Sequence, residues 1–432
     1  MKKVHKSKKR TCPTTKKGIK YFFSCVPCVL NSATIILLCV GGITLYRHIK
    51  SSVFKIEKGG KPLVEMAVNI PDFASKERIS WYGFQIASAD VSNADFSKAG
   101  DKIDYITFDD RTVFPSVDKM PKGFDPKKIM QDGKNPGLDV RELQSKGITG
   151  KGITIAIIDN KLFTEHPEYK DNIVHYENIG FPDVFPSMFH GSATASILCG
   201  KTVGVAPDVK LVYFASSPAK YIKESDTWEM DNLHENDIKV LKKIYDMNAR
   251  LPKDKRISAV SISRGEYHNS KNLPAFKEAV NKLIESGVMV LPVNSFDVYD
   301  DVNFAILYRK TDSNPDDVQS YTISHSGCMF DTGDCLLAPA GGRTMANSGG
   351  VDSYIYYGMN GGFSWAAPYI VGVYALAKQV YPNLQPKQFF EVAKKTGFVV
   401  SSTQAGYKNI IIQPAKIISY FQNKKNEQQK EQ

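Results

Sequence analysis

The 432-residue sequence predicts an α/β fold, in which a mostly parallel central sheet carries helices on both faces and one transmembrane helix precedes the domain. Continuous apolar, β-branched runs alternate with helical patterns after residue 126, which is typical of strands buried on both faces. A long uncharged segment follows a basic N-terminus. With 42% hydrophobic and 23% charged residues, the composition is that of a globular protein and not of a disordered chain.

The N-terminus predicts a membrane anchor. Residues 1–20 carry nine Lys or Arg and no acidic residue, so most of the net charge of +11 lies in this arm and the rest of the chain is not expected to bind nucleic acid. Residues 21–46 contain no charged residue and are long enough to cross a bilayer as a helix. The positive-inside rule places the basic arm in the cytoplasm and the remainder outside. A cleaved signal peptide has the same order of regions, but no small-x-small cleavage site follows the apolar segment.

The segment after the predicted span gives few signals. We interpret residues 47–125 as a stalk and N-terminal extension that could serve as a pro-region, with alternation typical of a strand at 103–108. Cys328 and Cys335 lie on the outer side, where they would close a short disulfide, and two free thiols are an equally good alternative. Residues 423–432 are predicted to be a polar tail.

Residues 126–422 have the pattern of a single α/β domain. Buried strands are predicted at 153–158, 209–214, 257–262 and 288–291, and helices at 138–146, 235–248 and 275–286. In open parallel sheets the ligand site lies beyond the carboxyl ends of the strands. Asp159 ends the first of these strands and is therefore a candidate site residue.

A second candidate is a serine at the start of a helix. Gly361 and Gly362 provide a flexible turn before Ser364, and Pro368 is expected in the first helical turn, where its missing N–H is tolerated. Unpaired N–H groups at a helix start favour a developing negative charge near Ser364. The alternative is an N-capping serine without chemistry.

His190 is the third candidate. It opens a run of small residues, 190–197, that closes at Gly200 as a short helix would, which lets the helix pack tightly and direct the imidazole into the site. Serine is a weak nucleophile at neutral pH, so an imidazole must remove its proton and a buried carboxylate must orient that imidazole. Asp159, His190 and Ser364 provide these three groups.

Three segments carry a resemblance to a known family. Residues 155–159 (IAIID), residues 190–196 (HGSATAS) with 203–207 (VGVAP), and residues 362–368 (GFSWAAP) resemble the Asp, His and Ser blocks of the subtilisin-like serine proteases. The resemblance covers about residues 137–415. It implies a membrane-anchored bacterial endopeptidase that cleaves proteins or peptides outside the cell through an acyl-enzyme, with Ser364 attacking, His190 as base then acid, and Asp159 orienting His190.

Other residues depart from the family pattern. Asn160 and Lys161 follow the aspartate where the family has Thr or Ser then Gly, and Phe363 and Trp365 replace Thr and Met. The family's oxyanion asparagine follows a glycine. Here the candidate is Asn294, which has no preceding glycine and could be a turn residue instead. Such a donor contributes about two to three orders of magnitude in rate in subtilisin, the example on which that figure rests.

The resemblance also suggests a substrate edge and a metal. Ser263, Arg264 and Gly265 match the family's substrate-binding strand, and we hypothesise that Arg264 favours acidic or polar side chains, the alternative being a guanidinium that points to solvent. Structural calcium is common in the family, although the sequence has no Asp-rich ligand loop. The altered flanks and the uncertain oxyanion donor keep a second function open, a catalytically weak or inactive binding or sensing module.

Overall fold

A five-stranded parallel sheet forms the centre of the fold, with strand order β11-β10-β5-β7-β6. Its strands are β5 (Thr154–Asp159), β6 (Ile173–Ile179), β7 (Lys210–Ser216), β10 (Ile257–Ile262) and β11 (Met289–Pro292). All six residues of β5 are buried, as expected for a strand covered on both faces. The four strands predicted from apolar runs are therefore confirmed.

The computed structural model describes residues 53–62, 68–69, 84–223, 225, 227–229, 234–265, 271–295, 298–299, 302–324, 333–402 and 406–430. The basic arm at 1–20 and the predicted transmembrane segment at 21–46 lie outside this described part. Within it, none of the helices is both long and apolar enough to cross a membrane.

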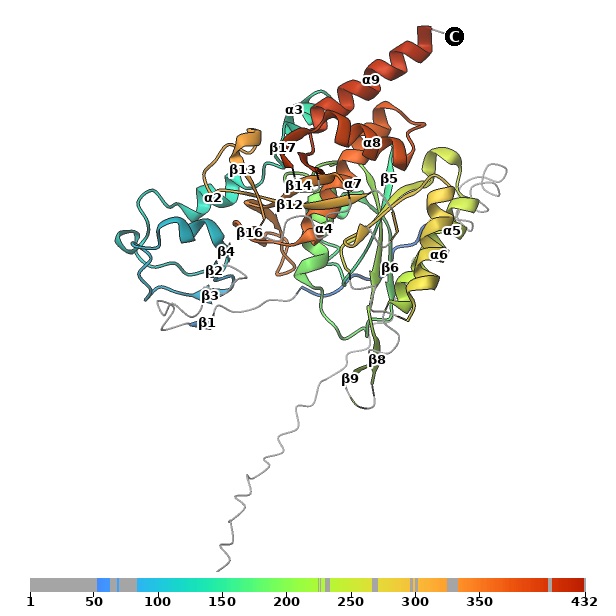
Figure 1. Cartoon of the computed structure of the whole chain (residues 1–432). Coiled ribbons are helices and arrows are strands. Elements are labelled where there is room, and N and C mark those ends of the chain that lie inside the picture. The colour runs from blue at the N-terminus through green and yellow to red at the C-terminus, as the bar shows by residue number, and fades with distance from the viewer. Residues whose placement is uncertain are drawn as a thin grey trace, which may run out of the picture. The chain divides into compact units, whose positions relative to one another are not determined.

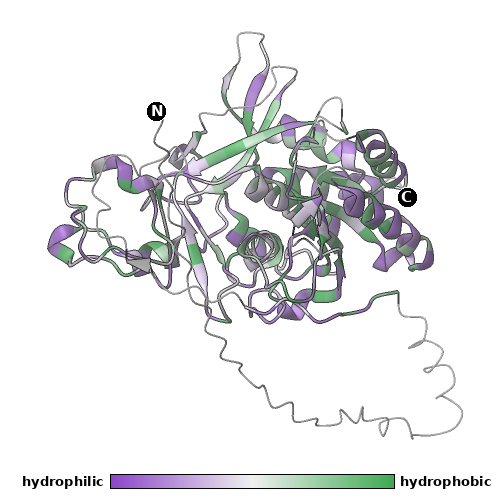
Figure 2. Ribbon diagram, turned by 90° about the horizontal axis from the view of Figure 1, so that it is seen from below, coloured by the Kyte–Doolittle hydropathy of each residue, from purple (hydrophilic) through white to green (hydrophobic). Residues whose placement is uncertain are grey.

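Helices cover the two faces of the central sheet (Figure 1). On one face, α5 (Glu235–Arg250) and α6 (Leu273–Glu285) pack against a core that includes Ile158. On the other, α4 (Phe189–Cys199) and α7 (Phe363–Val380) share a core with Ile157. Neighbouring residues of β5 thus feed opposite cores, as the alternation of side chains along a strand requires. Figure 2 shows hydrophobic residues along the inner strands, while the outer helices carry both hydrophobic and hydrophilic residues.

A second sheet lies in the C-terminal half, with strand order β13-β12-β14-β18-β17. Its strands are β12 (Asn303–Arg309), β13 (Tyr321–Ile323), β14 (Cys335–Gly341), β17 (Phe398–Ser402) and β18 (Lys408–Ile411). Cys335 is disulfide-bonded, and its partner cysteine lies outside the described residues.

The remaining helices are α2 (Pro126–Asp132), α3 (Val140–Ser145), α8 (Pro386–Thr396) and α9 (Pro414–Lys430), so the predicted polar tail begins inside α9. A short hairpin, β8 (Lys220–Ile222) and β9 (Thr227–Glu229), follows β7.

Residues 84–132, called here the N-terminal layer, pair with distant parts of the chain. In a four-stranded sheet, β4 (Ile106–Asp109) lies between β2 (Phe84–Gln85) and β16 (Tyr354–Tyr357), and β15 (Arg343–Ala346) is at the edge. Residues 100–105 form a 3₁₀ helix, so the strand expected at 103–108 begins only at Ile106. Phe108 packs against Tyr356 of β16 at a centroid distance of 5.4 Å. Two short strands, β1 (Val68–Asn69) and β3 (Ala89–Asp90), pair with each other. The predicted stalk thus contributes a strand to the interior of a sheet.

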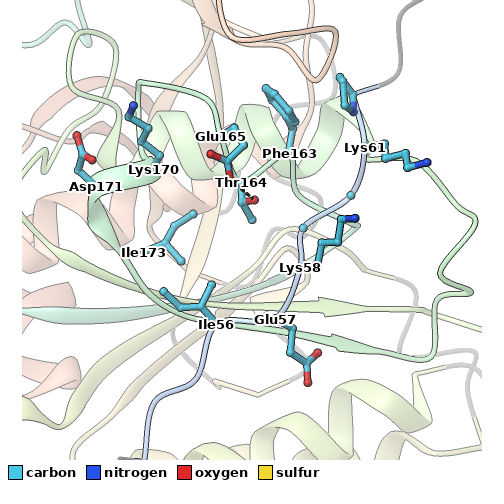
Figure 3. A pocket seen from close by; sticks show the side chains of 13 residues that line it. Ile56, Glu57, Lys58, Lys61, Phe163, Thr164, Glu165, Lys170, Asp171 and Ile173 are labelled. Carbon is cyan, nitrogen blue, oxygen red and sulfur yellow. Dashed lines mark hydrogen bonds between the residues drawn. The ribbon is translucent and has the colours of Figure 1, made fainter. Parts of the chain in front are cut away.

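Residues 53–62, called here the N-terminal strap, run along the outer edge of β6. The backbone N–H of Glu57 donates to the Tyr176 carbonyl at 2.9 Å, and the N–H of Tyr176 donates to the Lys55 carbonyl at 2.9 Å. Figure 3 shows the strap beside residues 163–173, with Ile56 facing Ile173. A cavity of about 540 Å³ lies between the two segments, and its lining includes none of the three candidate catalytic residues. The strap and the N-terminal layer belong to the same compact unit as the central sheet, residues 53–432.

Candidate active site

Asp159 and His190 meet at the carboxyl end of β5. His190 is the second residue of α4, and its Nδ1 lies 2.7 Å from Asp159 Oδ1. The aspartate is buried, whereas a quarter of the histidine side chain is exposed. A buried carboxylate can therefore hold one nitrogen of an imidazole whose other edge is accessible.

Two further donors fix the carboxylate. The backbone N–H of Asn160 donates to Oδ1 of Asp159 at 2.6 Å, and the Thr194 hydroxyl lies 3.1 Å from Oδ2. The same hydroxyl lies 3.1 Å from the Gly191 carbonyl, and its single proton serves one acceptor at a time. The sequence interpretation did not include Thr194. The available signal was its spacing, because residues four apart on a helix share a face and Thr194 is four residues after His190.

Ser364 is the second residue of α7 and contacts Ser263 at two points. The Ser364 hydroxyl donates to the Ser263 carbonyl at 3.0 Å, and the Ser263 hydroxyl donates to the Ser364 carbonyl at 2.9 Å. The sequence interpretation expected Pro368 in the first turn of the helix. It lies instead in the interior of α7. Since proline has no N–H, it cannot bond the carbonyl four residues earlier, which is that of Ser364. The Ser263 hydroxyl satisfies that freed carbonyl.

An aromatic cluster packs against His190. Trp365 lies 5.0 Å from the His190 ring, and it also contacts Phe189 at 6.1 Å and Tyr357 at 5.8 Å. The indole is buried, and its N–H has no hydrogen-bond partner in the described part of the chain. The replacement of Met by Trp at position 365 therefore changes the surroundings of the imidazole as well as the sequence next to Ser364.

Asn294 and Gly265 lie against each other. Asn294 lies two residues after the end of β11 and is buried, and a Cβ added to Gly265 would come within 2.9 to 3.1 Å of its side-chain amide. The absence of a side chain at Gly265 thus leaves the space that the Asn294 amide occupies. The structure brings the candidate oxyanion donor to the candidate substrate edge, although no glycine precedes Asn294 in the sequence.

Arg264 is turned away from this edge. Its guanidinium pairs with the buried Asp237 at 3.3 Å and donates to the Ser216 carbonyl at 2.8 Å. Burial alone would raise the pKa of Asp237, but Arg264, His234 and Ser216 lower it overall. The hypothesis that Arg264 selects acidic side chains loses its support, because the cation is already neutralised inside the protein.

Metal ligands are not gathered around these residues. Across the described ranges, no group of three or more His, Cys, Asp or Glu side chains is placed to hold a metal ion. The described residues therefore offer no candidate ligand group for the calcium that the family resemblance implies.

Comparison with known proteins gives the family. Residues 150–429 match the Subtilase family, which is more than half of the chain. The chain belongs to the subtilase family. By family, this subtilase is a serine-type peptidase, a hydrolase whose substrates are proteins.

Curated proteins and solved structures include relatives of this subtilase. It is 23% identical over 258 residues to the "Major intracellular serine protease" of Bacillus subtilis (strain 168), covering 55% of this chain and 72% of that protein. Similar solved structures include a subtilase cytotoxin SubAB assembly (14% identity, TM-score 0.46, covering 67% of this chain and 96% of that one). Another is fervidolysin from Fervidobacterium pennivorans (18% identity, TM-score 0.45, covering 66% and 45%). A third is a cold adapted subtilisin-like serine proteinase (19% identity, TM-score 0.41, covering 61% and 89%).

Proposed function

We propose that this subtilase is a membrane-anchored serine endopeptidase that uses Asp159, His190 and Ser364 as a catalytic triad. The observation that carries the proposal is the 2.7 Å contact between Asp159 and His190 at the end of β5, with Trp365, the residue after Ser364 in α7, 5.0 Å from the His190 ring. In this mechanism, the Asp159 carboxylate accepts a hydrogen bond from the Nδ1–H of His190, and the proton stays on Nδ1. Nε2 is then the acceptor for the Ser364 hydroxyl proton.

Attack on the substrate requires one local movement. The Ser364 hydroxyl donates to the Ser263 carbonyl in the structure, so it must rotate toward the imidazole before His190 can remove its proton. Ser364 Oγ then bonds to the scissile carbonyl carbon, and His190 delivers the proton to the leaving amine. In the second half of the reaction, His190 takes a proton from water, the water oxygen bonds to the acyl carbon, and the bond to Ser364 Oγ breaks as His190 returns the proton to that oxygen.

Backbone and amide donors would stabilise the oxyanion. The N–H of Ser364 is among the first of α7, and the first N–H groups of a helix have no intrahelical acceptor. The buried Asn294 side chain, held against Gly265, is proposed as the second donor. The backbone at Ser263 and Gly265 would pair with the substrate segment that precedes the scissile bond.

The anchor is also part of the proposal. The uncharged segment 21–46 after the basic arm supports a single membrane crossing with the peptidase outside the cell. The disulfide-bonded state of Cys335 supports an oxidising environment for that side.

A second function is favoured by one observation. In the structure the Ser364 hydroxyl is engaged with Ser263, an arrangement that would also suit a catalytically weak or inactive binding or sensing module. In that case the rotation of Ser364 toward His190 would not occur.

A covalent probe separates the two functions. The full chain in detergent is treated with a fluorophosphonate, with Ser364→Ala as the control. The peptidase predicts labelling of the wild type that the alanine variant lacks. Absence of labelling in the wild type supports the inactive module, and labelling that persists in the variant places the nucleophile elsewhere.

A further inference from the structure

A groove of about 260 Å³ lies where the N-terminal layer meets the peptidase core. Gln85, Ser88 and Arg111 of the N-terminal layer line one wall. Met188, Phe189 and Tyr357 line the other. The groove is smaller than the roughly 300–1,000 Å³ typical of small-molecule sites, so it suits a single side chain.

The groove adjoins the candidate triad. Phe189 directly precedes His190, and its ring stacks on Tyr357 at 6.2 Å with an interplanar angle of 8°. Both rings contact Trp365, which follows Ser364 and also contacts His190. A wall of the groove is therefore the outer surface of the aromatic cluster around the imidazole.

A buried carboxylate shapes the wall formed by the N-terminal layer. Asp109 accepts hydrogen bonds from the Ser88 N–H at 2.9 Å, the Ser88 hydroxyl at 2.6 Å and the Arg111 N–H at 3.1 Å. Ser88 has φ of 54°, a left-handed conformation that is unusual for serine and is held by these bonds. The Arg111 guanidinium lies against Gly349, where an added Cβ would overlap it. These contacts give the groove a fixed shape, as expected of a binding site.

The position relative to Ser364 indicates which part of a substrate reaches the groove. Ser263 contacts Ser364 from the end of β10, in the central sheet, and this is the edge proposed for the segment before the scissile bond. Tyr357 belongs to β16 of a different sheet, and with Phe189 it contacts the cluster around His190. His190 protonates the leaving amine, so the segment after the scissile bond departs on the histidine side.

We propose that the groove binds a large apolar side chain of the substrate on the C-terminal side of the scissile bond. Its apolar wall matches such a side chain, and its exposed residues, Gln85 and Met188, leave it open to solvent. The N-terminal layer is then a specificity element that stays with the enzyme during catalysis. This inference rests on the proposed peptidase function.

The test uses the full chain and internally quenched peptides that are identical before the scissile bond and vary at single positions after it. The wild type is expected to show at least a tenfold higher kcat/KM for Leu or Phe than for Lys at one of these positions, the order that apolar pockets achieve. Gln85→Glu and Met188→Glu each add a negative charge to one wall. Each is expected to reduce the Leu-to-Lys ratio about tenfold, because the charge attracts lysine and disfavours leucine.

Matched controls introduce a glutamate elsewhere, from Gln in one case and from an apolar residue in the other. Gln131→Glu lies on exposed α2 of the same layer, and Val184→Glu lies four residues before Met188 at a side chain that is 87% exposed. Neither residue lines the groove, so the ratio should stay at the wild-type value. Since the ratio is taken within one enzyme, a general loss of activity cancels.

Two kinds of failure are distinguishable. If the fluorophosphonate labels Ser364 but kcat/KM does not depend on the residues after the scissile bond, the groove proposal is overturned and the peptidase stands. Equal ratios for the groove variants and their controls overturn it in the same way. If the wild type is neither labelled nor active, the proposed function itself has failed.

Discussion

Thr194→Val removes one hydroxyl from the support of the candidate triad with almost no change of shape. In the structure that hydroxyl lies 3.1 Å from Oδ2 of the buried Asp159, whose other protein donors are the Asn160 N–H and His190 Nδ1. A hydrogen bond to a charged group contributes about 1.5–3 kcal/mol. Because the Gly191 carbonyl competes for the same proton, we expect the lower half of that range.

The loss should be visible in two measurements. The free energy of unfolding in urea at pH 7 is expected to fall by about 1.5–2 kcal/mol. An aspartate with one fewer contact holds His190 less firmly, and each 1.36 kcal/mol of lost transition-state stabilisation is tenfold in rate. We therefore expect kcat to fall about tenfold, while Thr194→Ser, which keeps the hydroxyl, retains most of it.

The control is the same substitution on β5. The Thr154 hydroxyl is buried and, among the described residues, has no hydrogen-bond partner, so Thr154→Val should leave kcat unchanged and increase stability by about 1–2 kcal/mol. Wild-type kcat in Thr194→Val, or an equal loss in Thr194→Ser, would refute the reasoning that Thr194 positions Asp159.

Three further predictions concern the site and its supports. Gly265→Ala should displace the Asn294 amide, because the new Cβ would lie within 2.9 to 3.1 Å of it. We expect kcat to fall by about as much as in Asn294→Ala, roughly a hundredfold. An unchanged kcat would exclude Asn294 as the oxyanion donor. Asp237→Leu leaves the Arg264 guanidinium without its buried partner, so the free energy of unfolding should fall by about 3–5 kcal/mol, and calorimetry showing a much smaller loss would contradict the buried pair. Burial lowers the pKa of His175 to about 4, so as the pH falls below about 6.5 the unfolded chain takes up a proton before the folded chain does. The free energy of unfolding should therefore be highest above that pH and decline by up to about 3 kcal/mol toward pH 4. His175→Gln should flatten this pH dependence.

The central sheet could be predicted because its signals are local. The run from Thr154 to Asp159 is buried on both faces, so its apolar pattern is continuous, and the strand appears where that pattern places it. The histidine and serine blocks were likewise recognisable from glycine and small residues that the local geometry requires. Asp159 at the end of its strand and His190 at the start of its helix then lie in contact in the structure.

The N-terminal layer could not be predicted in the same way. The alternation at 103–108 marked a strand close to β4, but β4 pairs with β16, about 250 residues further along, so nothing nearby in the sequence places that strand inside a sheet. Arg264 was misjudged for a related reason. Its partner Asp237 lies on α5, and only the fold shows that the guanidinium points inward. Both the position of β4 in its sheet and the direction of the Arg264 side chain depend on pairing between distant segments.

The most direct test of the central claim is whether Asp159, His190 and Ser364 act as one unit. We would measure kcat on one quenched peptide for Ser364→Ala, for His190→Ala and for the double variant. Residues of a triad are strongly non-additive, so each single variant should lose nearly as much activity as the double variant. Losses that simply multiply, or a wild type no faster than Ser364→Ala, would contradict the triad.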